Sequence, residues 1–139
     1  MNFINKYLNE TKEILDSLDQ NKISLLIDAI HKIKQKKGRI FFIGVGGSAA
    51  NCSHAVNDFR KICSIESYAI SDNVSELTAR TNDEGWKSVF VEWLKISKIN
   101  KNDCLFVLSV GGGNSSKNIS PNIIEAVRYS KLKKAKILG

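Results

Sequence analysis

The stretch Arg39-Ile40-Phe41-Phe42-Ile43-Gly44-Val45-Gly46-Gly47-Ser48 decides the fold class of this chain. Its first half is short, apolar without interruption and rich in β-prone residues, which is typical of a strand buried on both faces of a parallel sheet. Its second half is a glycine-rich turn, and the residues beyond it predict a helix from about Ser48 to Cys63. A buried strand that leads through glycines into a helix indicates an α/β fold.

The same arrangement recurs toward the C-terminus. Cys104–Ser109 predicts another buried strand, and it ends in the glycine-rich segment 110–114. Ser120-Pro121 then opens a helix, with serine at the N-cap and proline at the first helical position. A strand over Glu66–Ser71 lies between these two in sequence, and Lys136-Ile137-Leu138 begins a fourth. Strands that alternate with helices predict a three-layer sandwich, in which helices flank both faces of a parallel sheet.

Helical periodicity fills the remaining segments. Two amphipathic helices precede the first strand, and the second of them stops at Gly38. A further helical segment starts at Ser75, and another, beyond Gly85, carries Trp86, Phe90, Trp93 and Leu94. We therefore expect a single domain made of an N-terminal helix pair (1–38) and an α/β core (39–139). The core is expected to be incomplete, because the chain stops at Gly139 just after its fourth strand begins.

The charge balance is strongly basic, with 21 Lys and Arg against 14 Asp and Glu and a formal net charge of +7. The densest runs, His31–Lys37 and Lys131–Lys134, fall at the ends of predicted helices, where cations complement the helix dipole. No aromatic residues are interleaved with them, as a single-strand binder requires. We therefore expect neither nucleic acid nor a membrane as partner, and interpret the surplus as an attraction for a phosphorylated substrate.

The three cysteines, Cys52, Cys63 and Cys104, form no C-x-x-C pair and are odd in number. This pattern argues against a disulfide framework or a structural zinc site and fits a reducing compartment. The N-terminus lacks the apolar core of a signal peptide, and no apolar run approaches the ~20 residues that span a bilayer. We expect a soluble, cytoplasmic protein.

Two glycine-rich loops at the carboxyl ends of parallel strands predict a phosphate site, since helix N-termini offer N–H donors to an anion. A second interpretation stays open on the motif alone. Gly44 to Ala49 fits G-x-G-x-x-A, the dinucleotide fingerprint, and Asp72 follows where a ribose partner is expected. Against an NAD-binding domain stand the two helices ahead of the first strand. The second glycine loop also has no part in that fingerprint.

The combined motifs resemble the phosphoheptose isomerases, which have the SIS (sugar isomerase) fold. The resemblance rests on Gly44-x-Gly46-Gly47-Ser48 followed by His54 and Asp58, then on Ser71-Asp72, Asn82-Asp83 and the glycine loop that Ser109 opens. It covers residues 39–139 well and the N-terminal helices loosely. It implies conversion of sedoheptulose 7-phosphate to D-glycero-D-manno-heptose 7-phosphate by a homo-oligomer, a dimer or a tetramer. The alternative within the fold is a non-catalytic module that binds a phosphosugar.

The resemblance also implies a set of site residues. It places the substrate against the first glycine turn, the sugar hydroxyls against an Asn-Asp pair and the phosphate in the second glycine loop. These substrate-binding positions are Val45, Gly46, Gly47 and Ser48, then Asn82 and Asp83, then Ser109, Val110, Gly111 and Ser120. His54 and Asp58 match the family's His and Glu, which can hold a zinc ion, and Asp58 is the implied catalytic base. Their i, i+4 spacing puts both side chains on one helix face.

The chain departs from the family pattern at several of these positions. Val45 stands where the family usually has Asn, Asp58 where it has Glu, and Gly111 where it has Ser. Losing one methylene draws the carboxylate of Asp58 back by about 1 Å, a displacement that can cost ~10²-fold in rate. The family's Gln and His lie on a helix beyond the next strand, and residues 1–139 hold no counterpart. We therefore expect the 139-residue chain to be a weak isomerase or none.

Overall fold

The computed structural model describes residues 2–139 and divides into two compact units, of which the first ends at Ile30 and the second comprises His31–Gly139. The N-terminal unit holds α1 (Phe3–Asp16) and most of α2 (Gln20–Gln35), whose last turn belongs to the second unit. No residue of α1 is buried. Among the helices of residues 2–139, none combines the length and the apolar character needed to cross a membrane.

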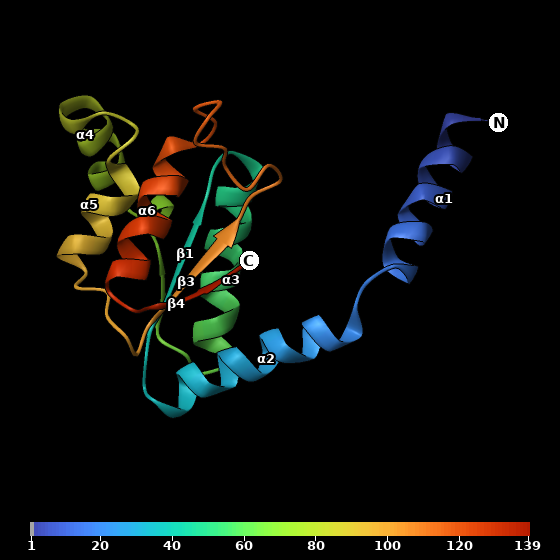
Figure 1. Ribbon diagram of the computed structural model, residues 1–139, viewed down its shortest axis with the longest axis horizontal. Coiled ribbons are helices and arrows are strands. Elements are labelled where there is room, and N and C mark those ends of the chain that lie inside the picture. The colour runs from blue at the N-terminus through green and yellow to red at the C-terminus, as the bar shows by residue number, and fades with distance from the viewer. Residues whose placement is uncertain (1) are drawn as a thin grey trace. The chain divides into compact units, whose positions relative to one another are not determined.

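The second unit contains one parallel sheet with the strand order β2-β1-β3-β4. Its strands are β1 (Ile40–Gly44), β2 (Ser67–Ala69), β3 (Cys104–Leu108) and β4 (Lys136–Leu138). α3 (Gly47–Lys61) covers one face of the sheet, and α5 (Val89–Ile96) and α6 (Pro121–Leu132) pack together over the other (Figure 1). This arrangement confirms the predicted parallel sheet flanked by helices.

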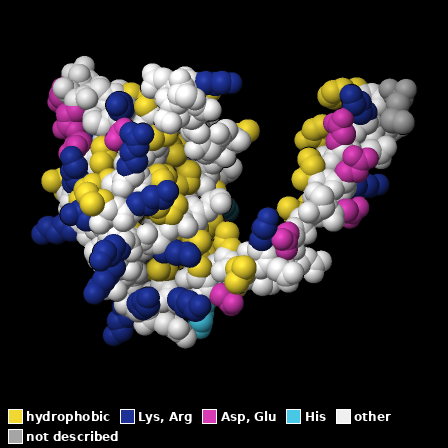
Figure 2. Space-filling model, in the orientation of Figure 1, with side chains coloured by type: hydrophobic (Ala, Val, Ile, Leu, Met, Phe, Trp, Pro, Cys, Tyr) yellow, Lys and Arg dark blue, Asp and Glu magenta, His cyan; other side chains and the backbone are white. Residues whose placement is uncertain are grey.

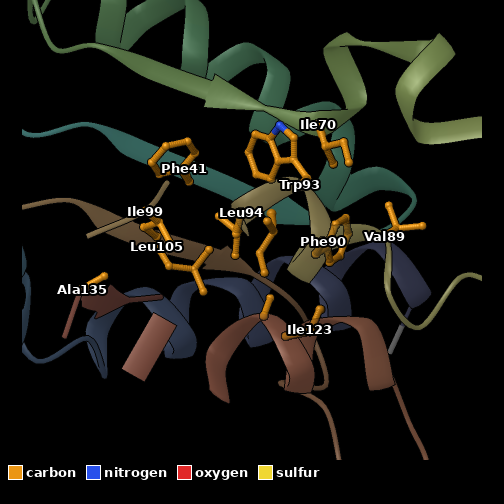
Figure 3. Packing of buried hydrophobic residues seen from close by; sticks show 12 residues of the cluster. Phe41, Ile70, Val89, Phe90, Trp93, Leu94, Ile99, Leu105, Ile123 and Ala135 are labelled. Atoms are coloured by element: carbon orange, nitrogen blue, oxygen red, sulfur yellow. The ribbon is translucent and has the colours of Figure 1, made fainter. Parts of the chain in front are cut away.

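The alternation of side chains along β1 supplies both halves of the core. Phe42 faces α3 and packs edge-on against Phe59, with 5.2 Å between the ring centroids. Phe41 points the other way and meets Trp93 of α5, with 5.3 Å between centroids. Phe41 belongs to the main hydrophobic cluster, which α5, α6 and β3 complete with Leu94, Ile123 and Leu105 (Figure 3). Every residue of β1 is buried, because helices cover both faces of the sheet. This explains why the strand is apolar throughout and does not alternate apolar with polar residues.

Two element boundaries differ from the sequence prediction. The strand predicted over Glu66–Ser71 is only Ser67–Ala69, and a 3₁₀ turn, η1 (Ile70–Asp72), takes its last residues. The chain turns there because the Asn73 side chain accepts a hydrogen bond from the N–H of Glu76 and caps α4 (Val74–Glu84). Trp86 precedes α5 instead of lying on it, since residues 85–88 form a turn that the Ser88 hydroxyl closes by donating to the carbonyls of Glu84 and Gly85.

A buried ion pair ties the start of β1 to the start of β3. Asp103 is 2% exposed, and its carboxylate accepts from the Arg39 backbone N–H at 3.0 Å, from Nε at 3.2 Å and from Nη2 at 2.8 Å. It also accepts from the backbone and side-chain amides of Asn100, at 3.0 and 2.9 Å. The hydrogen bond to Asp103 raises the pKa of the Arg39 guanidinium above its ordinary value. The pair is therefore fully hydrogen-bonded, as a buried charge requires.

We expect Asp103→Ala to lower the free energy of unfolding by roughly 3 kcal/mol, because it leaves the half-buried Arg39 without its partner. Urea denaturation followed by circular dichroism measures this change. Lys101→Ala, an exposed substitution in the same loop, is the control and should stay within about 0.5 kcal/mol of the parent chain. Equal stability of the two variants would show that the pair does not hold the strands together.

Candidate functional site

The strand order places a switch point between β1 and β3. The chain leaves β1 for β2 on one side and then crosses over to β3 on the other, so the order reverses between β1 and β3. The register pairs Gly44, the last residue of β1, with Leu108, the last residue of β3. The two glycine loops therefore leave the sheet from neighbouring positions. In open α/β sheets, ligands bind in the crevice at such a point.

The first loop is a tight turn that only glycines allow. A Cβ on Gly44 would lie 2.8 Å from backbone and side-chain atoms of Ser48, so the strand end packs directly on the first turn of α3. Gly46 has φ 61° and ψ −127°, a conformation that side-chain-bearing residues rarely adopt. Val45, Gly46 and Gly47 are exposed and Ser48 is half-buried. Ala49 and Ala50 donate their N–H groups to the Gly46 carbonyl, whereas the N–H groups of Gly47 and Ser48, at the positive end of the helix dipole, have no intrahelical acceptor.

The second loop borders an open cavity of about 550 Å³. Ser109, Val110, Gly111 and Gly112 line one side of it, and apolar side chains of α6 and β4 line the other. The Ser109 hydroxyl accepts a hydrogen bond from the N–H of Gly112 at 3.1 Å, which curls the loop back on itself. The structure thus gathers the predicted phosphate residues Ser109, Val110 and Gly111 at one cavity.

Ser120 starts α6 in an unexpected conformation. Pro121 occupies the first helical position as predicted, but Ser120 is left-handed, with φ 50° and ψ 54°, and its side chain makes no capping hydrogen bond. Ser120 therefore stands at the N-cap position, but the prediction that its side chain caps the helix is wrong. Only the backbone carbonyl of Ser120 serves the helix, by accepting from the N–H groups of Ile123 and Ile124. Ser120 is half-buried, and its hydroxyl caps no backbone N–H of α6.

His54 and Asp58 form the pair that their spacing predicts. Nε2 of His54 lies 3.2 Å from Oδ2 of Asp58 on α3, and the side chains are 78% and 40% exposed. The Asn57 amide donates to the other carboxylate oxygen at 3.1 Å. Zinc in proteins usually takes at least three protein ligands, and residues 2–139 contain no group of three His, Cys, Asp or Glu side chains that could hold a metal. The pair by itself does not make a zinc site.

Asn82 and Asp83 lie on the last turn of α4. The Asn82 side-chain amide donates to the Asp83 carboxylate at 2.8 Å, and both residues are exposed. They are available to hydroxyl groups, as a sugar contact requires. Their hydrogen bonds join them to each other and not to either glycine loop, so the structure does not bring them into the cavity beside Ser109.

A polar cluster that sequence reasoning did not assemble joins α3 to η1. The Ser53 hydroxyl donates to the carboxylate of Asp72 and lies 3.0 Å from the Ser71 hydroxyl. Sequence analysis named Asp72 as the ribose partner of a dinucleotide, but here Ser53 engages its carboxylate. No local pattern links the two, because they are 19 residues apart and meet only through the fold.

The two buried cysteines are not nucleophiles at neutral pH. Burial, with a smaller contribution from the Asp72 charge, raises the pKa of the Cys52 thiol to about 11. Burial likewise raises the pKa of Cys104 to about 12. Both thiols stay protonated under physiological conditions, and thiolate is the reactive form. Neither buried thiol is therefore a candidate nucleophile for this site.

Comparison with known proteins places these features in a family. The model of the SIS domain matches residues 6–139. The phosphoheptose isomerase of Cytophaga hutchinsonii is 32% identical over 121 residues, which are 82% of this chain and 58% of that protein. The phosphoheptose isomerase of Helicobacter pylori strain Shi470 is 29% identical over 117 residues, 81% of this chain and 57% of that protein. The chain therefore spans less than three fifths of the length of these relatives.

Solved structures show the same fold. Phosphoheptose isomerase GmhA from Neisseria gonorrhoeae superposes with a TM-score of 0.81 at 23% identity, over 96% of this chain and 68% of that chain. The phosphoheptose isomerase from Francisella tularensis gives a TM-score of 0.65 at 20% identity, over 99% of this chain and 73% of that one. The resemblance found in the glycine loops is thereby confirmed along almost the entire sequence, and the chain belongs to the SIS domain family.

Proposed function

We propose that this chain binds a sugar 7-phosphate and is the substrate-binding part of an isomerase that converts sedoheptulose 7-phosphate to D-glycero-D-manno-heptose 7-phosphate. One observation carries the proposal: two glycine loops start from the paired residues Gly44 and Leu108 at the switch point of a parallel sheet. The names of the relatives from Cytophaga hutchinsonii and Helicobacter pylori support the choice of substrate.

The loops suit the phosphate end of such a substrate. The Ser109–Gly112 loop has a hydroxyl and exposed backbone beside an open cavity, and glycines allow an anion to approach the backbone closely. The net charge of +7 on the chain favours the arrival of a phosphate dianion. Binding energy gained at the phosphate then orients the carbonyl end of the sugar at a distance from it.

Asp58 is the proposed base. Moving the carbonyl from C2 to C1 requires removal of a proton from C1, formation of an enediol and return of a proton to C2. The His54 imidazole, 3.2 Å from the Asp58 carboxylate, holds that carboxylate in place and stabilises its charge when protonated. An acid is also needed to move protons on the C1 and C2 oxygens of the sugar. The resemblance assigns that role to the family's His, which like its Gln has no counterpart in residues 1–139, so we propose that this chain supplies only half of the acid–base pair.

Zinc binding remains a prediction. His54 and Asp58 would supply two ligands, and further ligands would have to come from outside residues 2–139. We also propose a cytoplasmic location, which the free thiols Cys52, Cys63 and Cys104 fit.

Sedoheptulose 7-phosphate at millimolar concentration should raise the melting temperature of the chain, since a ligand that binds only the folded state stabilises it. Unphosphorylated sedoheptulose and NAD should have little effect in the same thermal-shift assay. Gly46→Ala should lower the affinity for the sugar phosphate about tenfold, because alanine does not tolerate the positive φ of Gly46 and the turn must change shape. Gly85→Ala is the matched control, since Gly85 also has positive φ and open space around its Cα but ends α4. An equal shift with NAD would contradict the proposal.

The 139-residue chain should convert sedoheptulose 7-phosphate ~10² to 10⁴-fold more slowly than a phosphoheptose isomerase that has the complete acid–base pair. Nuclear magnetic resonance of the sugar phosphates measures the conversion directly. Asp58→Asn should remove the residual turnover while retaining the thermal shift, because the amide keeps the shape and loses the base. Lys61→Gln, one turn further along α3, is the control. Rapid turnover by the unaltered chain would show that the assigned acid–base pair is wrong, and binding without any turnover would leave a phosphosugar-binding module.

The exposed apolar face of the N-terminal unit points to self-association, which we propose as the state of the protein in solution. Apolar side chains along α1 are largely exposed, among them Ile4, Leu8 and Leu15. They recur at helical spacing and form one stripe, whereas the opposite face is polar. An apolar stripe of this kind is normally covered by a partner helix. A second copy of the chain can supply that helix in a symmetric dimer or tetramer.

Leu8→Lys combined with Leu15→Lys should convert the assembly to monomers, because each lysine places a charge in the apolar stripe. Size-exclusion chromatography with light scattering measures the mass. Asn5→Lys combined with Asn9→Lys adds the same charge to the polar face of α1 and should leave the mass unchanged. A parent chain that is monomeric at high concentration would contradict the proposed assembly.

A further inference from the structure

Helices of the core converge on the edge of the sheet at which the strands begin. The helices run opposite to the strands, so α3, α5, α6 and the last turn of α2 all end at this edge. Hydrogen bonds tie the loops there together. Arg39 Nη2 donates to the carbonyl of Lys98 at 3.2 Å, the N–H of Lys136 to the carbonyl of Asp103 at 3.0 Å, and the N–H of Ile40 to the carbonyl of Glu66 at 2.9 Å. This edge lies opposite the glycine loops.

Eight exposed lysines gather on this edge and are here called the basal lysine cluster. Its members come from the four loops that precede the strands or from the adjoining residues: Lys36, Lys37, Lys61, Lys98, Lys101, Lys133, Lys134 and Lys136. None of them takes part in an ion pair within residues 2–139. Lys95, in the last turn of α5 beside this edge, is left out of the cluster because it pairs with Glu92. Figure 2 shows Lys and Arg side chains gathered toward this end of the core.

The acidic groups of the edge do not neutralise the cluster. Asp103 is buried, and its hydrogen bonds serve Arg39 and Asn100. Glu66 is exposed and accepts a hydrogen bond from the Tyr68 hydroxyl, so it keeps its charge and sets one carboxylate against eight lysines. Sequence analysis interpreted each lysine run by itself, as a complement to the dipole of its own helix, and on that ground expected no membrane partner. The fold adds these separate runs into one positive surface.

Exposed aliphatic side chains stand among the lysines. Ile62 is the C-cap of α3 and is 73% exposed, Ile96 ends α5 and is 72% exposed, and Leu132 ends α6 and is 75% exposed. A single exposed aliphatic residue is ordinary. Three of them, each at the last turn of a different helix on the same lysine-rich edge, make a surface that is both basic and apolar.

We propose that this edge docks on the surface of an anionic lipid bilayer. Lysines attract acidic headgroups, and exposed aliphatic side chains enter the boundary between headgroups and acyl chains. Peripheral binding strengthens with buried apolar area and with electrostatic attraction to anionic lipids, and this edge offers both. Docking in this way leaves the glycine loops at the opposite edge open to the aqueous phase, so substrate entry and membrane contact do not compete.

Other occupants fit the edge less well. A symmetric dimer through this face would set the lysines of one copy against those of the other, and like charges repel. Nucleic acid is usually read by arginine forks and by aromatic stacking. Arg39 is held by Asp103, and Arg60 donates to the Ser67 carbonyl and covers the Tyr68 ring. The aliphatic side chains of Ile62, Ile96 and Leu132 cannot stack on bases, whereas they suit lipid.

The test is sedimentation of the 139-residue chain with phosphatidylcholine vesicles, with and without phosphatidylglycerol. We expect binding to the anionic vesicles only, and weaker binding as salt is raised. Lys98→Gln, Lys101→Gln and Lys134→Gln together should lower vesicle partitioning by about 100-fold, at about fivefold for each lysine near the surface. The matched control is Lys6→Gln, Lys12→Gln and Lys117→Gln together. It removes the same charge from residues outside the cluster and should retain binding to the vesicles.

The aliphatic contribution is tested separately. Ile62→Ser, Ile96→Ser and Leu132→Ser together keep the net charge and should lower partitioning at least tenfold, most clearly at high salt. Circular dichroism verifies that each variant is folded. No sedimentation with anionic vesicles at low salt would overturn the proposal, as would equal losses in the cluster variant and its control. Tighter binding to a single-stranded oligonucleotide, or loss of dimers in the cluster variant, would assign the edge to nucleic acid or to a second copy instead.

Discussion

The hydrogen-bonded pair of Arg39 and Asp103 is the constraint on which the rest of the core depends. It joins the residues that immediately precede β1 and β3, two strands separated by 59 residues of chain and by β2 in sequence order. Fixing the two starts fixes the register, in which Ile40 pairs with Cys104 and Gly44 with Leu108. A parallel ladder transmits this alignment along its length. The position of the glycine loops at one edge of the sheet therefore follows from an ion pair at the other.

The two edges of the sheet have become chemically different surfaces. At the carboxyl edge the strands end in glycines, hydroxyls and a few carboxylates, and the backbone itself is exposed to a ligand. At the amino edge the helices end, and lysines placed to complement each helix dipole lie next to those of the neighbouring helices. In a parallel α/β fold the crossover helices start at one edge of the sheet and end at the other, so the chemical difference between the edges follows from the topology.

The candidate site combines two glycine loops with an exposed pair of polar side chains. Gly46 shapes the first loop by its positive φ, and the Ser109 hydroxyl curls the second by accepting from the N–H of Gly112. The pair of His54 and Asp58 is exposed and has no third acidic, histidine or cysteine partner within residues 2–139. The proposed phosphate contacts and the proposed proton transfer therefore rest on different residues, and loss of one need not remove the other.

The sequence by itself determined the elements that have strong local signals. The apolar run of β1, the glycines after it, Pro121 at the first turn of α6 and the i, i+4 pair on α3 are each specified within a few residues. It misjudged the end of β2 and the capping by Ser120, because a nearby turn or a left-handed backbone overrides the local propensity. Tertiary structure alone decided which distant residues meet. The contacts of Ser53 with Asp72 and of Arg39 with Asp103, the pairing of Gly44 with Leu108 and the gathering of the basal lysines all depend on strand order and register, which long-range packing sets.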